Sequence, residues 1–316
     1  MLIPIIFLII SIIVLAKASD WTIDGATTIA RHLKLSDLVV GFLLLSFATS
    51  LPELSVAISS GLSDAGGISL GDILGSNIVN ISLVIGLVAI FAGEILIKKE
   101  DIKQLSRVVL VSIVIIPFIL LNSYLGIVQG IILIVLFLVF LFYTLKEEIS
   151  LEYKGEQPSR KKTIKGLRNF IIGIFLIIVS ASFAVENSII IIEHFSLSQS
   201  FIGATVIAIG TSLPELFVSI RAIRKKYFNL ALGNALGSCI INLTLILGLL
   251  SILSPITLEK SVLTVIGTFA IISAVVMYYF LKTKNKLTKF EGMVLVLIYV
   301  IYLITLFLTQ TFSPPL

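Results

Sequence analysis

Long apolar runs recur along the whole chain and are separated by short polar segments. They lie at about residues 2–18, 38–60, 69–92, 106–121, 124–145, 170–192, 201–223, 229–252, 262–281 and 290–312. Because a helix needs about 20 mainly apolar residues to cross the hydrocarbon core of a bilayer, each run is predicted to be a transmembrane helix. The pattern therefore predicts an all-α polytopic membrane protein with ten transmembrane helices.

The polar positions inside these runs form a repeat. Segment 41–86 aligns with segment 203–248 without insertion or deletion, and 18 of the 46 aligned positions are identical. Each copy contains the pentad Thr-Ser-Leu-Pro-Glu, and equivalent residues are 162 positions apart. The chain is therefore expected to consist of two five-helix repeats, residues 1–145 and 169–316, joined by a short linker at 146–168.

Composition supports the membrane assignment. Apolar residues make up 58% of the chain and charged residues only 13%, and the mean hydropathy is +1.14, which is far from the soluble average. The first apolar run has neither the basic start nor the small-residue cleavage site of a signal peptide, so it is interpreted as a mature helix.

Basic residues then orient the helices. Of the 23 Lys and Arg residues, all except Lys260 fall in alternate loops, including the linker. Since basic residues accumulate in cytoplasmic loops, we expect a cell-membrane protein with both termini outside and a cytoplasmic linker. An odd number of spans per repeat makes the two repeats inverted. The net charge of +5 therefore reflects topology and contact with the lipid bilayer, and does not indicate nucleic-acid binding.

Each pentad places a carboxylate and hydroxyls on one face of a helix. Glu53 follows Thr49 by four residues and Ser50 by three, so the three side chains share a face. Pro52 has no N–H and crowds the carbonyl of Ala48, so the helix should bend there. Freed carbonyls at membrane depth are tolerated where they line a cavity. The second copy repeats this arrangement with Thr211, Ser212, Pro214 and Glu215.

The span after each pentad adds further polar groups. Ser76 and Asn80 are four residues apart, as are Ser238 and Asn242, so each pair shares a helical face. Glycines recur at the same spacing in these spans, at positions 71, 75, 233 and 237. Small residues at this spacing allow close helix packing, which is the interpretation we prefer for them.

The donor set predicts a cation site. No Lys or Arg lies at the expected depth of Glu53 and Glu215, and two carboxylates close together in a low-dielectric region repel each other unless a cation or a proton offsets them. Carboxylate, hydroxyl and carbonyl oxygens suit calcium, magnesium or sodium. Magnesium is less favoured because it dehydrates reluctantly. Cys239, the only cysteine, is expected to fill space.

At this point the chain resembles the calcium/cation antiporter superfamily, in particular its prokaryotic sodium/calcium exchangers. The resemblance extends over all ten expected spans and rests on the stretches 41–53 and 203–215, each followed by Gly-Ser-x-x-x-Asn. It implies a secondary active antiporter, not an enzyme, that exchanges calcium for sodium by alternating access. It further implies no cofactor and function as a monomer.

The resemblance also implies roles for individual residues. Glu53 and Glu215 would bind calcium together with the backbone carbonyls of Thr49 and Thr211. The two flanking sodium sites would be lined by Ser50, Ser76 and the carbonyl of Ala208, and by Ser212, Ser238 and the carbonyl of Ser46. Asn80 and Asn242 would face the centre. The first and sixth spans would slide as a long pair across the other eight, and residues 17–24 are expected to extend the first span as a polar helix.

Other functions stay open at this stage. Family members often carry an acid at one of the two Asn positions, whereas this chain has two amides, Asn80 and Asn242. Counting only Glu53 and Glu215, one calcium or two protons would neutralise the site, so a calcium/proton antiporter is the main alternative. A cation channel would also use carboxylates but needs no counter-ion. An intramembrane hydrolase would need a base beside Ser50 or Ser212, and no His or Lys lies at that depth.

Overall fold

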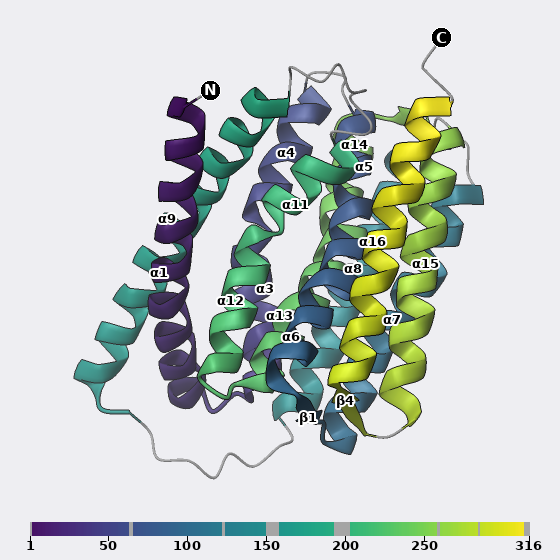
Figure 1. Ribbon diagram of the computed structural model, residues 1–316. Coiled ribbons are helices and arrows are strands. Elements are labelled where there is room, and N and C mark those ends of the chain that lie inside the picture. The colour runs from purple at the N-terminus through teal and green to yellow at the C-terminus, as the bar shows by residue number, and fades with distance from the viewer. Residues whose placement is uncertain are drawn as a thin grey trace.

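The structure is a computed structural model that describes residues 2–62, 66–121, 124–149, 158–192, 203–257, 260–283 and 285–312. In this part of the chain the fold is a bundle of helices with two short strand pairs (Figure 1). The first half contains α1 (Leu2–Leu33), α2 (Asp37–Val40), η1 (Gly41–Leu45), α3 (Ser46–Thr49), α4 (Leu51–Leu62), α5 (Gly66–Ile78), η2 (Val79–Val84), α6 (Ile85–Ala92), β1 (Glu94–Leu96), α7 (Lys99–Leu121), β2 (Tyr124–Leu125) and α8 (Ile127–Ile149). The second half contains α9 (Arg160–Ile192), η4 (Gly203–Ile207), α11 (Ala208–Thr211), α12 (Leu213–Arg224), α13 (Phe228–Ile240), η5 (Ile241–Ile246), α14 (Leu247–Leu253), β3 (Ile256–Thr257), α15 (Lys260–Thr283), β4 (Lys286–Thr288) and α16 (Lys289–Phe312).

The prediction of an all-helical chain is confirmed, since helices cover the expected apolar runs in the described residues apart from short breaks at Ser50 and Ser212 and the strand β2. Seven helices of the described chain are long and apolar enough to cross a membrane, or up to nine when each of two bent helix pairs counts as one span. The first expected span lies within α1, which is outside that count. The apolar side chains exposed on the surface, including Phe142, Phe175 and Phe307, are suited to contact lipid.

The helix α1 continues without a break to Leu33, as the sequence predicted for its polar extension. It lies beside α9 at one side of the bundle, and both helices are longer than the others (Figure 1). α9 begins at Arg160, about ten residues before the expected apolar run, so the basic cluster that follows Ser159 is helical. The expected linker at 146–168 is therefore helical at both of its described ends, while residues 150–157 lie outside the described chain.

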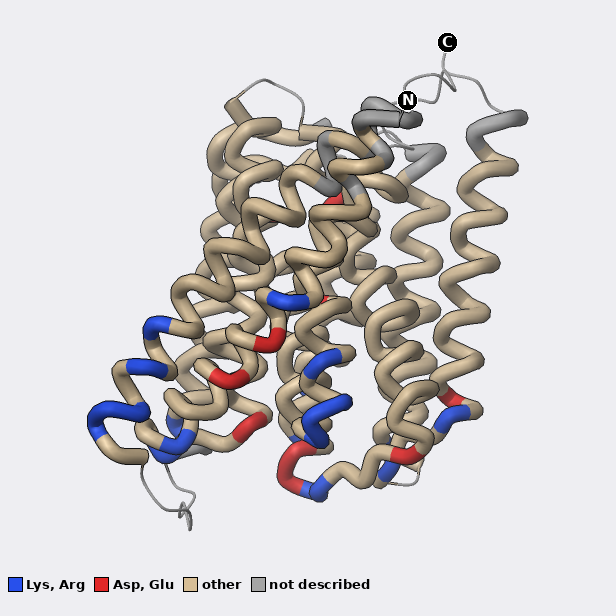
Figure 2. The backbone as a smooth tube through the Cα atoms, turned by 60° about the vertical axis from the view of Figure 1, so that its left-hand side comes forward, with Lys and Arg blue, Asp and Glu red and all other residues tan. Residues whose placement is uncertain are grey.

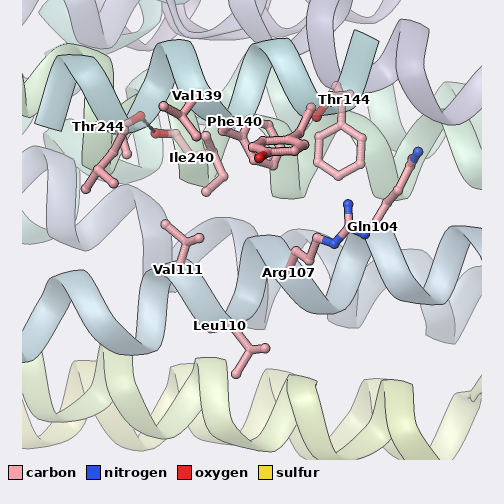
Figure 3. Close-up of a pocket in the computed structure, with 12 residues that line it drawn as sticks. Gln104, Arg107, Leu110, Val111, Val139, Phe140, Thr144, Ile240 and Thr244 are labelled. Carbon is pink, nitrogen blue, oxygen red and sulfur yellow. Dashed lines mark hydrogen bonds between the residues drawn. The ribbon is translucent and has the colours of Figure 1, made fainter. Parts of the chain in front are cut away.

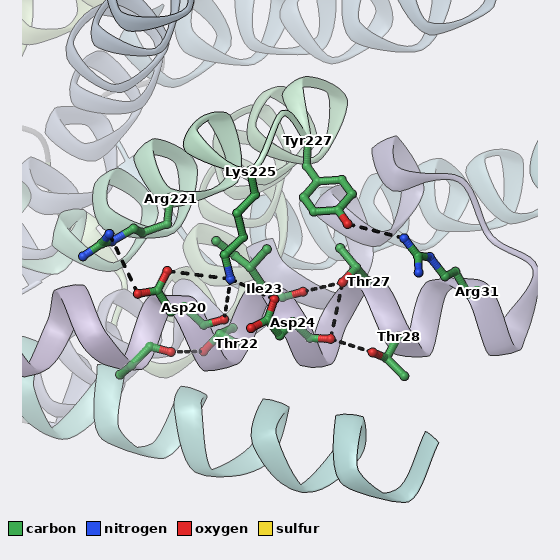
Figure 4. Close-up of polar contacts among 11 residues, drawn as sticks. Asp20, Thr22, Ile23, Asp24, Thr27, Thr28, Arg31, Arg221, Lys225 and Tyr227 are labelled. Carbon is green, nitrogen blue, oxygen red and sulfur yellow. Dashed lines mark hydrogen bonds and ion pairs between the residues drawn. The ribbon is translucent and has the colours of Figure 1, made fainter. Parts of the chain in front are cut away.

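Ion pairs join the polar end of α1 to α12 (Figure 4). Lys225 Nζ lies 2.8 Å from Asp24 Oδ1 and 3.7 Å from Asp20 Oδ1, and Arg221 Nη1 lies 3.8 Å from Asp20 Oδ2. The Asp24 side chain is 58% exposed, so solvent and salt weaken its attraction to Lys225.

Substituting Asp24→Asn is therefore expected to have a small effect. Exposed ion pairs contribute about 1 kcal/mol or less, so we expect the melting temperature in detergent to fall by no more than about 4 °C. The difference should shrink when salt is added, because salt screens the pair in the parent protein. A fall of 10 °C or more in this assay would contradict a weak surface pair.

The two halves share local geometry as well as sequence. The one-turn π-helical segments η1 and η2 of the first half recur as η4 and η5 of the second, each displaced by 162 residues. The strands recur in the same way: β1 begins at Glu94 and β3 begins at Ile256, also 162 residues later.

The strands pair between the halves rather than within them. β1 pairs with β4, and β2 pairs with β3, both antiparallel. Because β1 precedes α7 and β2 follows it, the two sheets lie at opposite ends of that 23-residue helix, which is about 35 Å long. Figure 1 shows β1 and β4 together at one end of the bundle.

Charge is distributed unevenly along the bundle. Lys and Arg gather toward the end that holds β1 and β4 (Figures 1 and 2), where the structure places Lys98, Lys99, Lys286 and Lys289. The beginning of α1 and the end of α16 lie at the other end (Figure 1). This asymmetry is the one expected for a protein oriented by the positive-inside rule.

Candidate ion-binding site

Two helices of the described chain are broken by a sharp bend. The axis bends by 42° between Thr49 and Leu51 and by 44° between Thr211 and Leu213. Ser50 and Ser212 stand at the breaks with φ and ψ near −85° and 9°, and −82° and 2°. Each proline follows in the first turn of the new helix, where its missing N–H leaves no bond unmade. The bends predicted from the prolines are therefore present, and each bend lies two residues before its proline.

The helices that follow the breaks are the most buried spans of the described chain. In an apolar stretch of 18 residues within each span, 83% is buried in Gly66–Ala92 and 78% in Phe228–Leu253, whereas the other unbroken spans range from 17% to 44%. These two spans carry the Ser-x-x-x-Asn pairs, so Ser76, Asn80, Ser238 and Asn242 all lie on the most buried of the unbroken spans.

All twelve predicted site residues are buried, each with at most 1% of its surface exposed. They are Ser46, Thr49, Ser50, Glu53, Ser76, Asn80, Ala208, Thr211, Ser212, Glu215, Ser238 and Asn242.

Contacts between the repeats bring several of these residues together. Ser50 Oγ of the first repeat donates to Glu215 Oε1 of the second (3.3 Å), and Ser238 Oγ donates to the same oxygen (2.9 Å). In the same direction, Ser76 Oγ of the first repeat donates to the carbonyl oxygen of Ala208 in the second (3.4 Å). Polar residues of the two halves therefore lie within hydrogen-bonding distance of one another here, an arrangement that a central site shared by both repeats would need.

Several buried polar atoms at this site have no hydrogen-bond partner within the described part of the chain. They are both carboxylate oxygens of Glu53, Oε2 of Glu215, Oγ of Ser212 and the side-chain oxygen and nitrogen atoms of Asn80 and Asn242. Leaving such atoms buried and unpaired is costly. The unpaired oxygens come from carboxylates, amides and a hydroxyl, which are the ligands that calcium and sodium accept, so the donor set fits these cations as transported substrates.

The backbone carbonyls named for the flanking sites are arranged alike in the two repeats. The carbonyl of Ser46 accepts the N–H of Ser50 (3.0 Å), and the carbonyl of Ala208 accepts the N–H of Ser212 (3.2 Å). Each carbonyl also lies 3.4 Å from the hydroxyl of the pentad threonine that follows it. A carbonyl oxygen has two lone pairs, but these contacts leave less acceptor capacity here than at Glu53.

The structure buries a further carboxylate that the sequence pattern did not single out. Asp72 on α5 is 0% exposed, and its Oδ1 accepts hydrogen bonds from Thr211 Oγ1 (2.9 Å) and Ser76 Oγ (3.4 Å). Asp72 is therefore a third buried carboxylate, in contact with residues of the predicted site, beside the two glutamates that the sequence pattern singled out. The available signal was an acid inside an apolar span, but its repeat partner is Asn234, so a comparison of identical positions passes over it.

Glycines allow the central helices to approach closely, which supports the packing interpretation. A Cβ placed on Gly75 would lie 2.8 Å from the carbonyl oxygen of Ala204 and 2.9 Å from Ala208 Cβ. A Cβ on Gly237 would lie 2.6 Å from Ser46 Oγ. These glycines therefore hold backbone segments of the site in contact with each other.

Gly75→Ala should destabilise the fold through this contact. We expect a loss of about 1–3 kcal/mol, because the added methyl would have to displace backbone. Gly67→Ala on the same helix is the matched control, since nothing lies within 4 Å of its added Cβ, and it should be neutral or slightly stabilising. Thermal unfolding of both variants in detergent measures the difference, and equal melting temperatures would contradict the close approach.

A cavity of about 520 Å³ lies between α7, α8 and the α13–η5 span, and none of the twelve predicted site residues lines it (Figure 3). Its lining is mainly apolar, with Phe42, Val111 and Phe140 among its residues, and it contains no carboxylate. Because calcium sites in proteins are built from several converging oxygens, carboxylates among them, a mainly apolar cavity with Arg107 in its lining is a poor place for such an ion.

Comparisons with known proteins bear on this site and fold. The family model described as sodium/calcium exchanger protein matches residues 3–146 and 166–308. The sodium/calcium exchanger MaX1 of Methanosarcina acetivorans is 28% identical over 364 residues, covering 96% of this chain and 98% of the relative. The inner membrane protein YrbG of Escherichia coli is 31% identical over 265 residues, 81% of each chain. A solved structure of the sodium-calcium exchanger NCX_Mj soaked with Na⁺ and Sr²⁺ matches with a TM-score of 0.82 and 30% identity, covering 96% of this chain and 99% of that one.

Proposed function

The chain belongs to the sodium/calcium exchanger family, and from this premise we propose that it exchanges calcium for sodium at the buried carboxylate site. Membership makes it a multi-pass membrane protein and a cation exchanger, since the family is one of transporters. The same comparisons do not favour the calcium/proton alternative. The ions, the site residues and the transport cycle are our proposal.

The observation that carries the proposal is the set of unpaired oxygens around Glu53 and Glu215. A calcium ion would balance the two glutamates and take ligands from both repeats, with the carbonyls of Thr49 and Thr211 beside them. Sodium ions would use the same glutamate oxygens together with Ser50, Ser212, Ser76 and Ser238. Because both cations need these oxygens, they occupy the site in turn, and the movement of one is coupled to the movement of the other.

We place the site in ten spans arranged as two inverted repeats, residues 1–145 and 169–316. The strand pairs support this arrangement. β1 and its repeat equivalent β3 belong to sheets at opposite ends of α7, as expected when the second repeat enters the membrane from the opposite side. The separate family matches to each half are consistent with the same division.

The end of the bundle rich in Lys and Arg is assigned to the cytoplasm, which places both termini outside. We propose alternating access in which the site opens to one side of the membrane and then to the other. The long pair α1 and α9 is the natural moving part, because it lies at one side of the bundle (Figure 1). Both halves of the site come from one chain, so a monomer is sufficient.

The proposal is tested by calcium uptake into proteoliposomes containing the purified protein. An outward sodium gradient at equal pH should drive uptake, and an outward proton gradient without sodium should not. Uptake driven only by protons would overturn sodium coupling, and uptake that needs neither gradient would indicate a channel.

A further inference from the structure

Asp72 is a buried acid that the proposed exchange at Glu53 and Glu215 does not require. It lies in a group of oxygens from both repeats, which we call the Asp72 cluster: Asp72, Ser76, Thr211 and the carbonyl of Ala208. Thr211 Oγ1 lies 2.9 Å from Asp72 Oδ1, and Ser76 Oγ lies 3.4 Å from each of Asp72 Oδ1, Thr211 Oγ1 and the Ala208 oxygen. Every member is at most 1% exposed.

The second repeat shows what a neutral residue does at this position. Asn234, the equivalent of Asp72, accepts the hydroxyl of Thr49 (3.2 Å), as Asp72 accepts that of Thr211. Its amide nitrogen donates to Ser219 Oγ (3.2 Å) and to the carbonyl oxygen of Glu215 (3.4 Å). Both ends of this amide therefore have partners, and Asn234 is explained by structure alone.

Asp72 has no such explanation. Its Oδ2 is buried and has no hydrogen-bond partner among the described residues, and the residue equivalent to Ser219 is Ala57, which offers no polar group. The neighbouring acids repel it rather than pair with it, since Glu215 interacts unfavourably with its charge. A buried carboxylate in this position needs a cation beside it or a proton on it.

We propose that Asp72 is a direct sodium ligand in this cluster, so that one of the two flanking ion sites has an additional negative charge that its counterpart around Asn234 lacks. This inference rests on the proposed sodium/calcium exchange. Glu53, Asp72 and Glu215 together would carry three negative charges, so one calcium ion leaves one of them unbalanced, whereas a sodium ion beside Asp72 balances that charge locally. Asp72 thus favours the sodium-loaded state over the calcium-loaded state.

The test is Asp72→Asn, which copies the residue of the second repeat. Asn keeps an oxygen that can accept from Thr211, as Asn234 accepts from Thr49, and removes only the charge. The sodium concentration for half-maximal sodium-driven calcium uptake should rise by about tenfold or more, because a full charge beside the ion is lost in a water-poor site. Exchange of labelled for unlabelled calcium without sodium should persist, with a smaller shift in its calcium dependence.

Two further variants separate charge from structure. Asn77→Cys copies the neighbouring second-repeat residue, Cys239, onto the same helix and should leave the sodium dependence unchanged. If Asp72→Asn folds poorly, Ala57→Ser with Asp72→Asn rebuilds the Asn234–Ser219 pair and should show the same sodium defect. Sodium dependence equal to that of the parent protein would overturn the proposal and make Asp72 a permanently protonated residue.

An equal loss of sodium-driven uptake and calcium self-exchange would also overturn it, since that result indicates a structural role. A change confined to the pH dependence of uptake would identify a proton site and reject sodium. Failure of the proposed function is distinguishable, because the parent protein itself would then show no sodium-driven uptake.

Discussion

Glu53→Gln and Glu215→Gln should each abolish sodium-driven calcium uptake. Glutamine keeps the size of the side chain but removes the charge that binds the ion. Breaking one partner of a buried charge pair costs about 3–5 kcal/mol, which corresponds to at least about a 100-fold loss of affinity. The measurement is initial calcium uptake into proteoliposomes under an outward sodium gradient.

The two variants should still fold, because neutralising an acid relieves repulsion at this site. Glu291→Gln is the matched control: Glu291 is also buried, at 6% exposed, but it accepts hydrogen bonds from Thr288 at the start of α16, far along the chain from the pentads. That variant should transport normally. Uptake retained by either Glu53→Gln or Glu215→Gln would remove that glutamate from the transport mechanism.

Calcium should also stabilise the purified protein. A ligand that binds only the folded state adds about 2.7 kcal/mol at a concentration 100 times its dissociation constant, which is enough to raise the melting temperature by several degrees. Removing calcium with a chelator in sodium-free buffer should reverse the shift. Magnesium should not replace calcium, because it loses its water reluctantly.

The stabilisation has its own internal control. Glu215→Gln should lose the calcium-dependent shift, since Glu215 is the acid held between Ser50 and Ser238 at the junction of the repeats. Glu291→Gln should keep it. An equal calcium shift in the Glu215→Gln protein would mean that calcium acts at another place on the protein.

Much of this architecture could be predicted from the sequence because it depends on local chemistry. The length of the apolar runs predicts the helices, and Pro52 and Pro214 predict the two bends. The polar extension of α1 was also predictable. The π-helical segments η1, η2, η4 and η5 carry no such local signal, because inserting a residue into a helical turn depends on packing against neighbouring helices.

Other features depend on contacts that the sequence alone does not report. The start of α9 at Arg160 was missed because apolar runs mark the part of a helix inside the membrane, and its polar first turns lie outside that run. Asp72 was missed because the repeat was interpreted through identical pairs. The structure brings it against Thr211, 139 residues away in the chain, and this contact makes it a candidate for the site.

The most direct test of the central claim counts both ions in the same vesicles. Proteoliposomes loaded with labelled sodium are placed in labelled calcium, and sodium loss and calcium gain are followed together for the parent protein and for Glu53→Gln. We predict that calcium enters only as sodium leaves, in a fixed ratio, and that both movements stop in the variant. Calcium entry without sodium loss, or unchanged exchange in Glu53→Gln, would contradict sodium/calcium exchange at this carboxylate site.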